Sequence, residues 1–180
     1  MPHETLAPSP WVRRWARLVP PGEVLDLACG AGRHARFFAG LGHSVLALDR
    51  DAQRLAALAD VPGVRTLAAD LEQGAWPLGG RCFAGVVVAN YLHRALFVPI
   101  LAALAPGGVL IYETFAVGNE RFGKPSNPAF LLRAGELLQA FGAQLAVVAF
   151  EQGRVERPRP AVVQRLCARR APDLDAALEG

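Results

Sequence analysis

A glycine-rich turn after an apolar run is the first feature of the sequence that could bind a ligand. Residues 24–38 read VLDLACGAGRHARFF, in which Gly30 and Gly32 separate the apolar run from a helical pattern. The stretch from Gly30 to Ala35 fits GxGxxG/A, a fingerprint of dinucleotide-binding turns. At such a turn the free amides of a helix N-terminus approach an anionic or hydrogen-bond-accepting group. The motif alone leaves three alternatives open: a dinucleotide phosphate, a smaller nucleoside cofactor, or a turn without a ligand.

Three aspartates help to distinguish these alternatives. Asp26 lies in the apolar run itself, Asp49 ends a second run 17 residues after Gly32, and Asp70 ends a third. If the runs are adjacent parallel strands, all three carboxylates lie near their carboxyl ends, where open α/β sheets bind ligands. A pyrophosphate gains nothing from neighbouring acids. A ribose diol, an amine or a positive charge gains from each, because a hydrogen bond to a charged group contributes roughly 1.5 to 3 kcal/mol.

Each of these features also has a purely structural interpretation. The glycines could mark a tight turn only, and Asp49 could cap a helix that begins near Asp51. His34, in the first turn of the expected helix, is predicted to be a surface or packing residue. Cys29 is predicted to be a small residue in the turn rather than a reactive thiol, because nothing nearby marks it as activated.

The elements that position these residues alternate between strands and helices. Apolar runs predict strands at 23–28, 44–49, 64–70, 83–90, 109–115, 143–151 and 160–170. Helices are predicted at 10–18, 33–42, 52–60, 94–105 and 130–141, loops at 71–82 and 116–129, and a turn at 106–108. This order predicts an α/β fold: a Rossmann-like, doubly wound, mostly parallel seven-stranded sheet with helices on both faces. A short proline-rich turn joins the last two strands, so they should form an antiparallel edge hairpin.

Length and composition set the wider expectations. The chain has 180 residues and is predicted to be one domain, 1–180, with an N-terminal helical cap at 1–20 and a tail at 171–180. No apolar run approaches the roughly 18 residues of a membrane span, and the N-terminus lacks the apolar core of a signal peptide, so we expect a cytoplasmic protein without a membrane partner. The oligomeric state is not predicted.

Charge and cysteine usage argue against two further kinds of site. The net charge is +3, but the arginines are spread along the chain rather than gathered in one segment, which argues against a nucleic-acid partner. Cys29, Cys82 and Cys167 form no CxxC pair or Cys/His cluster, so no metal site is predicted.

Three segments together resemble a known family. The stretch VLDLACGAGRHARFFAGLGHSVLALDRD resembles motif I and the following acidic loop of the class I S-adenosylmethionine-dependent methyltransferases. AADLE resembles their adenine-contacting segment, and LAPGGVLIYETF resembles their turn and fifth strand. The resemblance covers about residues 20–115 and extends to small bacterial members, including the tellurite-resistance type. It implies a methyltransferase enzyme with S-adenosyl-L-methionine as cofactor.

The resemblance implies roles around the methionine part of the cofactor. The backbone at Ala28, Gly30 and Gly32 would approach it, and Asp26 would order the turn or bind the ammonium group through water. Asn90, which ends the fourth strand, would face the same moiety. Many family members have glycine where this chain has Ala28.

The resemblance also implies roles around the nucleoside. Asp49 would accept hydrogen bonds from the ribose hydroxyls, and Arg50 would lie along the adenine. Asp70, together with the amide of Leu71, would read the adenine edge. If the carboxylate of Asp49 bonds only to ligand, its removal should weaken cofactor binding and change the stability of the fold little.

The region after the fourth strand is where an acceptor is expected. It reads ANYLHRALF and lacks the [DNS]-P-P-[YFW] motif that accompanies methylation of planar amines. Tyr91 and His93 are the candidate catalytic residues, and His93 could act as a general base. Arg94 is a candidate substrate-binding residue. Alternatively His93 and Arg94 begin a helix and line the cofactor, and no dedicated base exists, because orientation can do most of an in-line displacement.

The loop 116–129 is a second candidate for contact with the acceptor. It contains Arg121, Phe122 and Lys124, which suit a polar or anionic small molecule. Both connections should overhang one crevice, and the loop should be mobile until it closes over substrate. The alternative is a solvated loop.

The sequence therefore predicts methyl transfer from S-adenosylmethionine to an unidentified small-molecule acceptor. Two other classes stay open, an NAD(P)-binding oxidoreductase and a non-catalytic S-adenosylmethionine-binding module. The oxidoreductase rests only on the GxGxxA match, and strand order distinguishes it, because a methyltransferase has an antiparallel edge hairpin. RNA stays open as an acceptor, although no separate RNA-binding domain fits in the chain.

Overall fold

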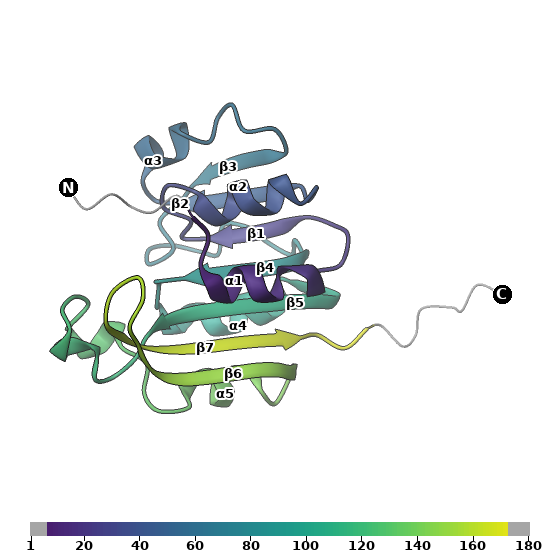
Figure 1. The fold of residues 1–180 in the computed structure, drawn as a ribbon. Helices are drawn as coiled ribbons and strands as arrows, with labels where there is room; N and C mark the ends of the chain where they lie inside the picture. The colour runs from purple at the N-terminus through teal and green to yellow at the C-terminus, as the bar shows by residue number, and fades with distance from the viewer. Residues whose placement is uncertain (1–6, 173–180) are drawn as a thin grey trace.

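A computed structural model describes residues 7–172 of the chain. Its sheet has seven strands in the order β3-β2-β1-β4-β5-β7-β6 (Figure 1). The strands are β1 (Val24–Leu27), β2 (Val45–Asp49), β3 (Val64–Ala68), β4 (Phe83–Ala89), β5 (Leu104–Phe115), β6 (Ala146–Val155) and β7 (Ala161–Arg169). Strands β1 to β5 are parallel to one another, whereas β7 is antiparallel to both β5 and β6. The predicted mostly parallel sheet with an antiparallel hairpin at one edge is confirmed.

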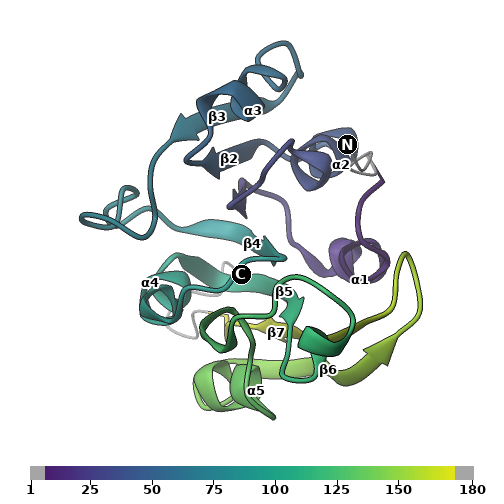
Figure 2. The ribbon, with the colours of Figure 1, turned by 90° about the vertical axis from the view of Figure 1, so that its left-hand side faces the viewer.

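Helices cover both faces of the sheet (Figures 1 and 2). The described α-helices are α1 (Pro10–Trp15), α2 (Arg33–Gly40), α3 (Ala52–Ala56), α4 (Phe97–Ala102) and α5 (Glu136–Phe141). Trp11, Phe38 and Leu55 of the first three pack in one apolar cluster, whereas Ile100 of α4 and Leu137 of α5 pack in another. The doubly wound arrangement therefore has two cores, one on each face.

The central strands are apolar throughout because both of their faces are covered. In β1, Val24 contributes to the core under α1 and α2, whereas Leu25 and Leu27 contribute to the core under α4 and α5. All three side chains are fully buried. Burial of one such side chain contributes about 1.5 to 3 kcal/mol. Asp26 is the exception in this strand, so its position requires a specific partner.

The helix ends differ from the sequence-based expectation, most of all in α3 and α5. Helix α3 ends at Ala56 rather than near residue 60, because Leu55 and Leu58 are the buried side chains of this alanine-rich stretch and the chain turns between them. Helix α5 begins at Glu136 rather than near 130, because a 3-10 turn at Pro128–Phe130 and a bridge from Leu132 to Ala116 come first.

The strand ends differ as well. Strand β5 begins at Leu104 and includes the Pro-Gly-Gly stretch that predicts a turn. Its pairing with β4 shifts from Phe83–Leu104 to Gly85–Val109, so this stretch forms a bulge in the strand. Gly107 has a φ of 74°, which other residues rarely adopt. Strand β6 begins three residues later than predicted and ends at Val155.

The predicted ends of the chain fall partly outside the described residues. Of the helical cap at 1–20, the structure describes α1 and a 3-10 turn at Ala16–Leu18, and residues 1–6 lie outside. Residues 173–180 of the expected tail also lie outside. Within 7–172, no helix is long and apolar enough to cross a membrane.

Candidate functional site

A cavity of about 460 Å³ opens at the carboxyl ends of β1, β2 and β4 and beside the turn after β3. Eight residues that the sequence predicts to hold a cofactor line it, namely Asp26, Ala28, Gly30, Asp49, Arg50, Asp70, Leu71 and Asn90. Gly32 is the exception, because it is buried against Leu58, and a Cβ at Gly32 would lie 2.4 Å from that side chain. The volume lies within the range of about 300–1,000 Å³ that is typical of cofactor sites.

Asp26 ties β1 to the first turn of α2. Its side chain is only 2% exposed, and its Oδ2 accepts a hydrogen bond of 2.8 Å from the amide of Ala35. Burial raises the pKa of this carboxyl to about 7, although the Ala35 amide and the nearby Arg33 act in the opposite direction. Asp26 therefore orders the glycine-rich turn, as the resemblance implies, and carries a carboxyl that titrates near neutral pH.

The turn itself is built from left-handed backbone. Ala28, Gly30 and Gly32 have φ values of 54°, 56° and 75°. Glycine adopts this conformation at no steric penalty, whereas a residue with a Cβ loses about 1–2 kcal/mol. Ala28 is therefore strained at the position where many relatives of the resembled family have glycine. Asn90, at the end of β4, is also left-handed, with a φ of 57°.

Asp49 bridges the glycine-rich turn and the turn after β2. Its Oδ2 accepts from the amide of Gly30 at 2.8 Å, and its Oδ1 accepts from the amide of Asp51 at 2.9 Å. The helix cap of α3 is Asp51, which accepts from the amides of Gln53 and Arg54, so Asp49 is not the cap. A carboxylate offers about four acceptor positions, so both oxygens of Asp49 can still accept ligand hydroxyls. Its bonds do not go to ligand alone, which corrects the expectation that its removal leaves stability unchanged.

The turn after β3 offers a donor and an acceptor side by side. Asp70 Oδ1 accepts from the amide of Glu72 at 2.9 Å. The amide of Leu71 between them makes no hydrogen bond to another described residue, although it lines the cavity. One free N–H beside one carboxylate is the pattern that an adenine edge requires, with a ring nitrogen as acceptor and an exocyclic amine as donor.

Comparison with known proteins identifies the domain. Residues 24–108 match the family model of a methyltransferase domain. This match covers a little under half of the chain, and it includes the glycine-rich turn and the three aspartates of the site. No curated protein sequence matches the chain. The match agrees with the resemblance stated from the motifs, over much of the same segment of the chain.

Solved structures of methyltransferases share the fold. TehB from Haemophilus influenzae is 18% identical with a TM-score of 0.77, and the alignment covers 93% of this chain and 64% of TehB. A methyltransferase from Mesorhizobium loti is 22% identical with a TM-score of 0.67, over 88% and 96% of the two chains. The 1,6-didemethyltoxoflavin-N1-methyltransferase of Burkholderia thailandensis is 24% identical with a TM-score of 0.69, over 94% and 80%. This chain thus spans about two thirds of TehB, and these likenesses establish the fold.

The methyltransferase domain places the two candidate catalytic residues differently. Tyr91 lines the cofactor cavity, and its hydroxyl donates to Glu72 Oε1 at 3.5 Å, on the side of Asp70. Burial, followed by the charge of Glu72, raises the pKa of the Tyr91 phenol well above its usual value, so Tyr91 acts as a donor rather than a base. His93 lines neither this cavity nor the second cavity described below. The proposed base role of His93 therefore has no supporting contact.

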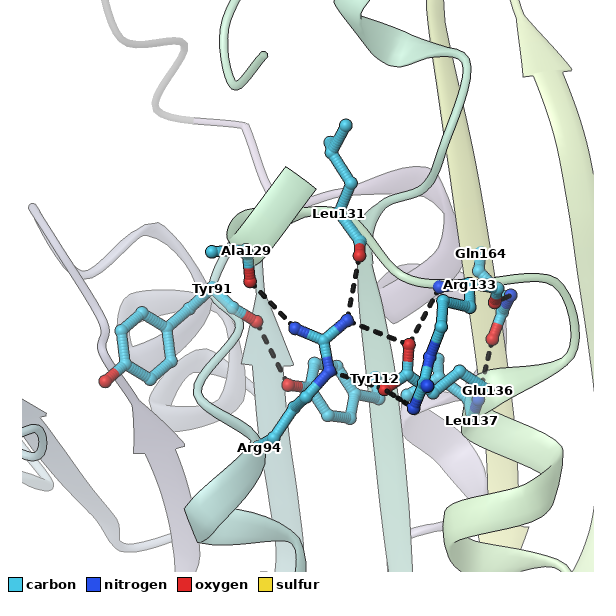
Figure 3. Close-up of polar contacts among 9 residues, drawn as sticks. All are labelled: Tyr91, Arg94, Tyr112, Ala129, Leu131, Arg133, Glu136, Leu137 and Gln164. Atoms are coloured by element: carbon cyan, nitrogen blue, oxygen red, sulfur yellow. Dashed lines mark hydrogen bonds and ion pairs between the residues drawn. The ribbon is translucent and has the colours of Figure 1, made fainter. Parts of the chain in front are cut away.

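Arg94 is engaged inside the protein rather than with a ligand. Its Nε and Nη2 donate to the two carboxylate oxygens of Glu136 at 2.6 and 3.0 Å, and its remaining donors reach the carbonyls of Ala129 and Leu131 (Figure 3). Burial alone would raise the pKa of Glu136, but hydrogen bonds from Arg94 and Arg133 outweigh it and lower the pKa to about 2. The sequence could not indicate this partner, which lies 42 residues away along the chain.

The loop 116–129 is anchored to the sheet. Asn119 is buried, donates to the carbonyl of Pro125 at 3.0 Å and accepts from the amide of Val162 at 3.2 Å. Its candidate substrate residues, Arg121, Phe122 and Lys124, are exposed and line neither cavity. None of these three side chains therefore lines the crevice that the sequence predicts beneath the loop, and the second cavity described below is lined by other residues.

His34 is a residue of the site for which the sequence predicts only packing. It is buried, lines the cofactor cavity, and its Nε2 accepts from the amide of Ser9 at 3.2 Å. Burial, helped by Arg33, lowers the pKa of His34 to about 3, so the imidazole is neutral. Ser9 also caps α1 through its hydroxyl. His34 thus joins the N-terminal segment to α2, a contact that no local pattern reveals.

The residues present in 7–172 give no indication of a metal centre. No group of three or more His, Cys, Asp or Glu side chains in this part of the chain is arranged to hold a metal ion. Cys29 lines the cavity, but burial raises the pKa of its thiol well above the usual value, which keeps it protonated and unreactive.

Substitution of Asp49 tests its double role. We expect Asp49→Ala to weaken binding of S-adenosylhomocysteine by about ten- to a hundredfold, because two hydroxyl bonds to a carboxylate are lost. We also expect the free energy of unfolding to fall by about 1–2 kcal/mol, because the amides of Gly30 and Asp51 lose their acceptor. Calorimetry and urea titration measure the two effects. Reduced stability with normal binding would leave Asp49 a structural role only.

Cofactor affinity should depend on pH through Asp26. In the free protein this carboxyl has a pKa of about 7, raised by burial, and a bound ammonium group favours its ionised form. Below pH 7 binding must therefore displace a proton. Affinity for S-adenosylhomocysteine should rise as pH increases, by up to about tenfold per unit, and level off above 7. Titration calorimetry in wild type and Asp26→Asn measures this, and an identical pH dependence in both would contradict it.

Arg94→Ala should affect stability rather than substrate binding. Its loss removes two of the hydrogen bonds to the buried carboxylate of Glu136 and the side-chain donor of two carbonyls, so we expect the free energy of unfolding to fall by about 2 kcal/mol, a value discounted for the partial exposure of Arg94. Arg133→Ala is the matched control, because that side chain is 74% exposed and its contact to Glu136 is 3.4 Å long. Urea titration measures both variants. A raised KM with unchanged stability would restore the substrate role that the sequence suggests.

Proposed function

We propose that this protein transfers a methyl group from S-adenosylmethionine to a small-molecule acceptor by in-line displacement. The observation that carries the proposal is the cofactor cavity, in which the three aspartates expected from the sequence meet the glycine-rich turn. The acids that line it are Asp26, Asp49, Asp51, Asp70 and Glu72, whereas Arg33, Arg50 and Arg54 supply the basic side chains. Such a surface suits a ligand with hydroxyl, amino and cationic groups.

Each part of the cofactor has residues that fit it. The free amide of Leu71 and the carboxylate of Asp70 would hold the adenine edge, and Asp49 would hold the ribose hydroxyls. Asp26 and the backbone of the glycine-rich turn would hold the amino-acid end. When bound, the cofactor supplies an electrophilic methyl group on a sulfonium sulfur.

The described side chains of the cavity favour orientation over acid–base chemistry. The low pKa of His34 comes from burial and leaves its imidazole neutral, with one ring nitrogen already bonded to Ser9. The phenol of Tyr91 keeps its proton. We therefore infer that the protein contributes mainly by holding the acceptor in line with the methyl group and excluding water.

The acceptor would enter a second cavity of about 450 Å³ that adjoins the first. Arg33 and Asn90 line both cavities. This volume fits a small metabolite better than a folded protein or a nucleic-acid duplex. A cytoplasmic location stays a prediction from the sequence.

An NAD(P)-dependent oxidoreductase is less well supported. The antiparallel placement of β7 between β5 and β6 is the arrangement that distinguishes a methyltransferase fold from a dinucleotide-binding one. The amide of Gly30 also donates to the carboxylate of Asp49, so it is not free to bind a pyrophosphate. A non-catalytic S-adenosylmethionine-binding module would use the same cofactor cavity, and it would differ from the proposed enzyme only because it transfers no methyl group.

Binding and turnover together test the proposed function. S-adenosylmethionine or S-adenosylhomocysteine should bind at micromolar affinity and NAD or NADP far more weakly, as calorimetry can measure. Formation of S-adenosylhomocysteine should then be followed by mass spectrometry with a broad acceptor panel. A preference for NAD would refute the cofactor assignment, and binding without turnover on the whole panel would favour the binding module.

A further inference from the structure

The second cavity has walls that come from both ends of the described chain. Ser9 and Pro10 at the start of α1 form one side, and the turn that joins β6 to β7 forms the other, with Arg157 and Arg159 among its lining residues. Figures 1 and 2 show this turn and α1 at the same edge of the sheet, where the parallel strands end. Glu113 and Thr114 of β5 form the floor.

This cavity meets the cofactor cavity at Arg33 and Asn90, which line both. The backbone of Asn90 is fixed there, because its main-chain N–H donates to the main-chain carbonyl of Glu113 at 2.9 Å. If the cofactor binds as proposed, this junction gives a molecule in the second cavity a route to the methyl group.

Positive charge dominates the lining of the second cavity. Its ionisable residues are one glutamate, Glu113, and five arginines, Arg13, Arg33, Arg157, Arg159 and Arg165. Only Arg165 is paired, with Glu113 at 3.1 Å and Glu151 at 3.4 Å. Within 7–172, the guanidinium groups of the other four make no hydrogen bond or ion pair with another residue. Guanidinium groups gathered without acceptors are suited to bind carboxylate or phosphate oxygens, often in bidentate fashion.

The rest of the lining is largely apolar. Pro8, Phe115, Val155 and Val163 contribute to it, together with the proline between the two arginines of the hairpin turn. A linear polyanion would leave this surface uncovered, whereas a compact body with one anionic group would use both parts. The buried carboxylate of Glu113 also orients such a molecule. It stands next to the junction, because β5 pairs it with Ala89 of β4, and its ion pair with Arg165 leaves that guanidinium less free to bind an anionic group there.

We propose that the methyl acceptor is a small organic anion, a carboxylate or phosphate monoester on a compact apolar body. It binds in the second cavity with its anionic group toward Arg157 and Arg159 and its nucleophilic atom toward Arg33 and Asn90. This assignment rests on the proposed function, because it names the acceptor class for the same reaction. An RNA phosphate is the competing source of negative charge, and the experiment separates the two.

Two probes of nearly equal shape but different charge, salicylate and salicylamide, test the assignment beside two further anions. Salicylate, phenyl phosphate, neutral salicylamide and a short single-stranded RNA are titrated by calorimetry at one ionic strength, with and without S-adenosylhomocysteine. We expect both small anions to bind at least tenfold more tightly than salicylamide. The double variant Arg157→Gln, Arg159→Gln should lose at least tenfold in affinity for the anions and keep its affinity for salicylamide and S-adenosylhomocysteine.

Arg154→Gln is the matched control, because Arg154 lies on the same hairpin, pairs with Glu156 at 2.8 Å and does not line the cavity. It should bind the anions as wild type does. The assignment is overturned if salicylate and salicylamide bind equally, if the double variant binds anions normally, or if RNA alone binds through these arginines. Failure to bind S-adenosylhomocysteine would instead refute the proposed function, a result independent of anion binding to the free protein.

Discussion

The hydrogen bond from the amide of Ala35 to the buried carboxyl of Asp26 is the contact on which both cavities depend. It holds the first turn of α2 against β1. From that turn His34 reaches the amide of Ser9, so the N-terminal segment that walls the second cavity is positioned by the same helix that forms the first. Arg33, in the same turn, lines both cavities. One buried contact therefore sets the position of cofactor and acceptor relative to each other.

This contact has an energetic disadvantage that a ligand can offset. Burial raises the pKa of Asp26 from 3.8 to about 7, so its folded value lies above its unfolded value. Protonated Asp26 therefore contributes to the free energy of unfolding at acid pH. This contribution is lost as pH rises through 7, and the loss amounts to about 4 kcal/mol. The left-handed backbone of Ala28 adds strain beside it. A strand that only packs in the core would need neither the buried carboxyl nor the strained backbone. In a ligand site, a bound cationic group stabilises the carboxylate that burial alone destabilises.

The cofactor cavity could be predicted from the sequence because its parts are local and topology brings them together. Each predicted residue lies at the end of a strand or in the turn after it, and parallel strands end at one edge of the sheet, so Asp26, Asp49 and Asp70 had to meet. The end of α3 could not be predicted, because its alanine-rich stretch continues a helical pattern where nothing remains to be buried. The start of α5 could not be predicted either, because the bridge from Leu132 to Ala116 that precedes it joins two separate segments. Arg94 follows β4 like the true lining residues, but a glutamate 42 positions later determines its contacts. The second cavity joins segments near residues 9 and 157, and no periodicity or spacing connects these.

The two cavities carry opposite charge, and this contrast constrains the chemistry of their ligands. A cationic group is attracted to the acids around the glycine-rich turn and repelled by the arginines of the second cavity, and an anionic acceptor experiences the reverse. Each ligand is thus kept out of the other's place. Methyl transfer spreads the positive charge of the sulfonium over the donor and acceptor atoms in the transition state, so removal of water from the junction disfavours the concentrated charge of the donor more than the transition state. Asn90 at this junction is neutral and is held in place through its backbone, so it adds no charge beside the reacting atoms.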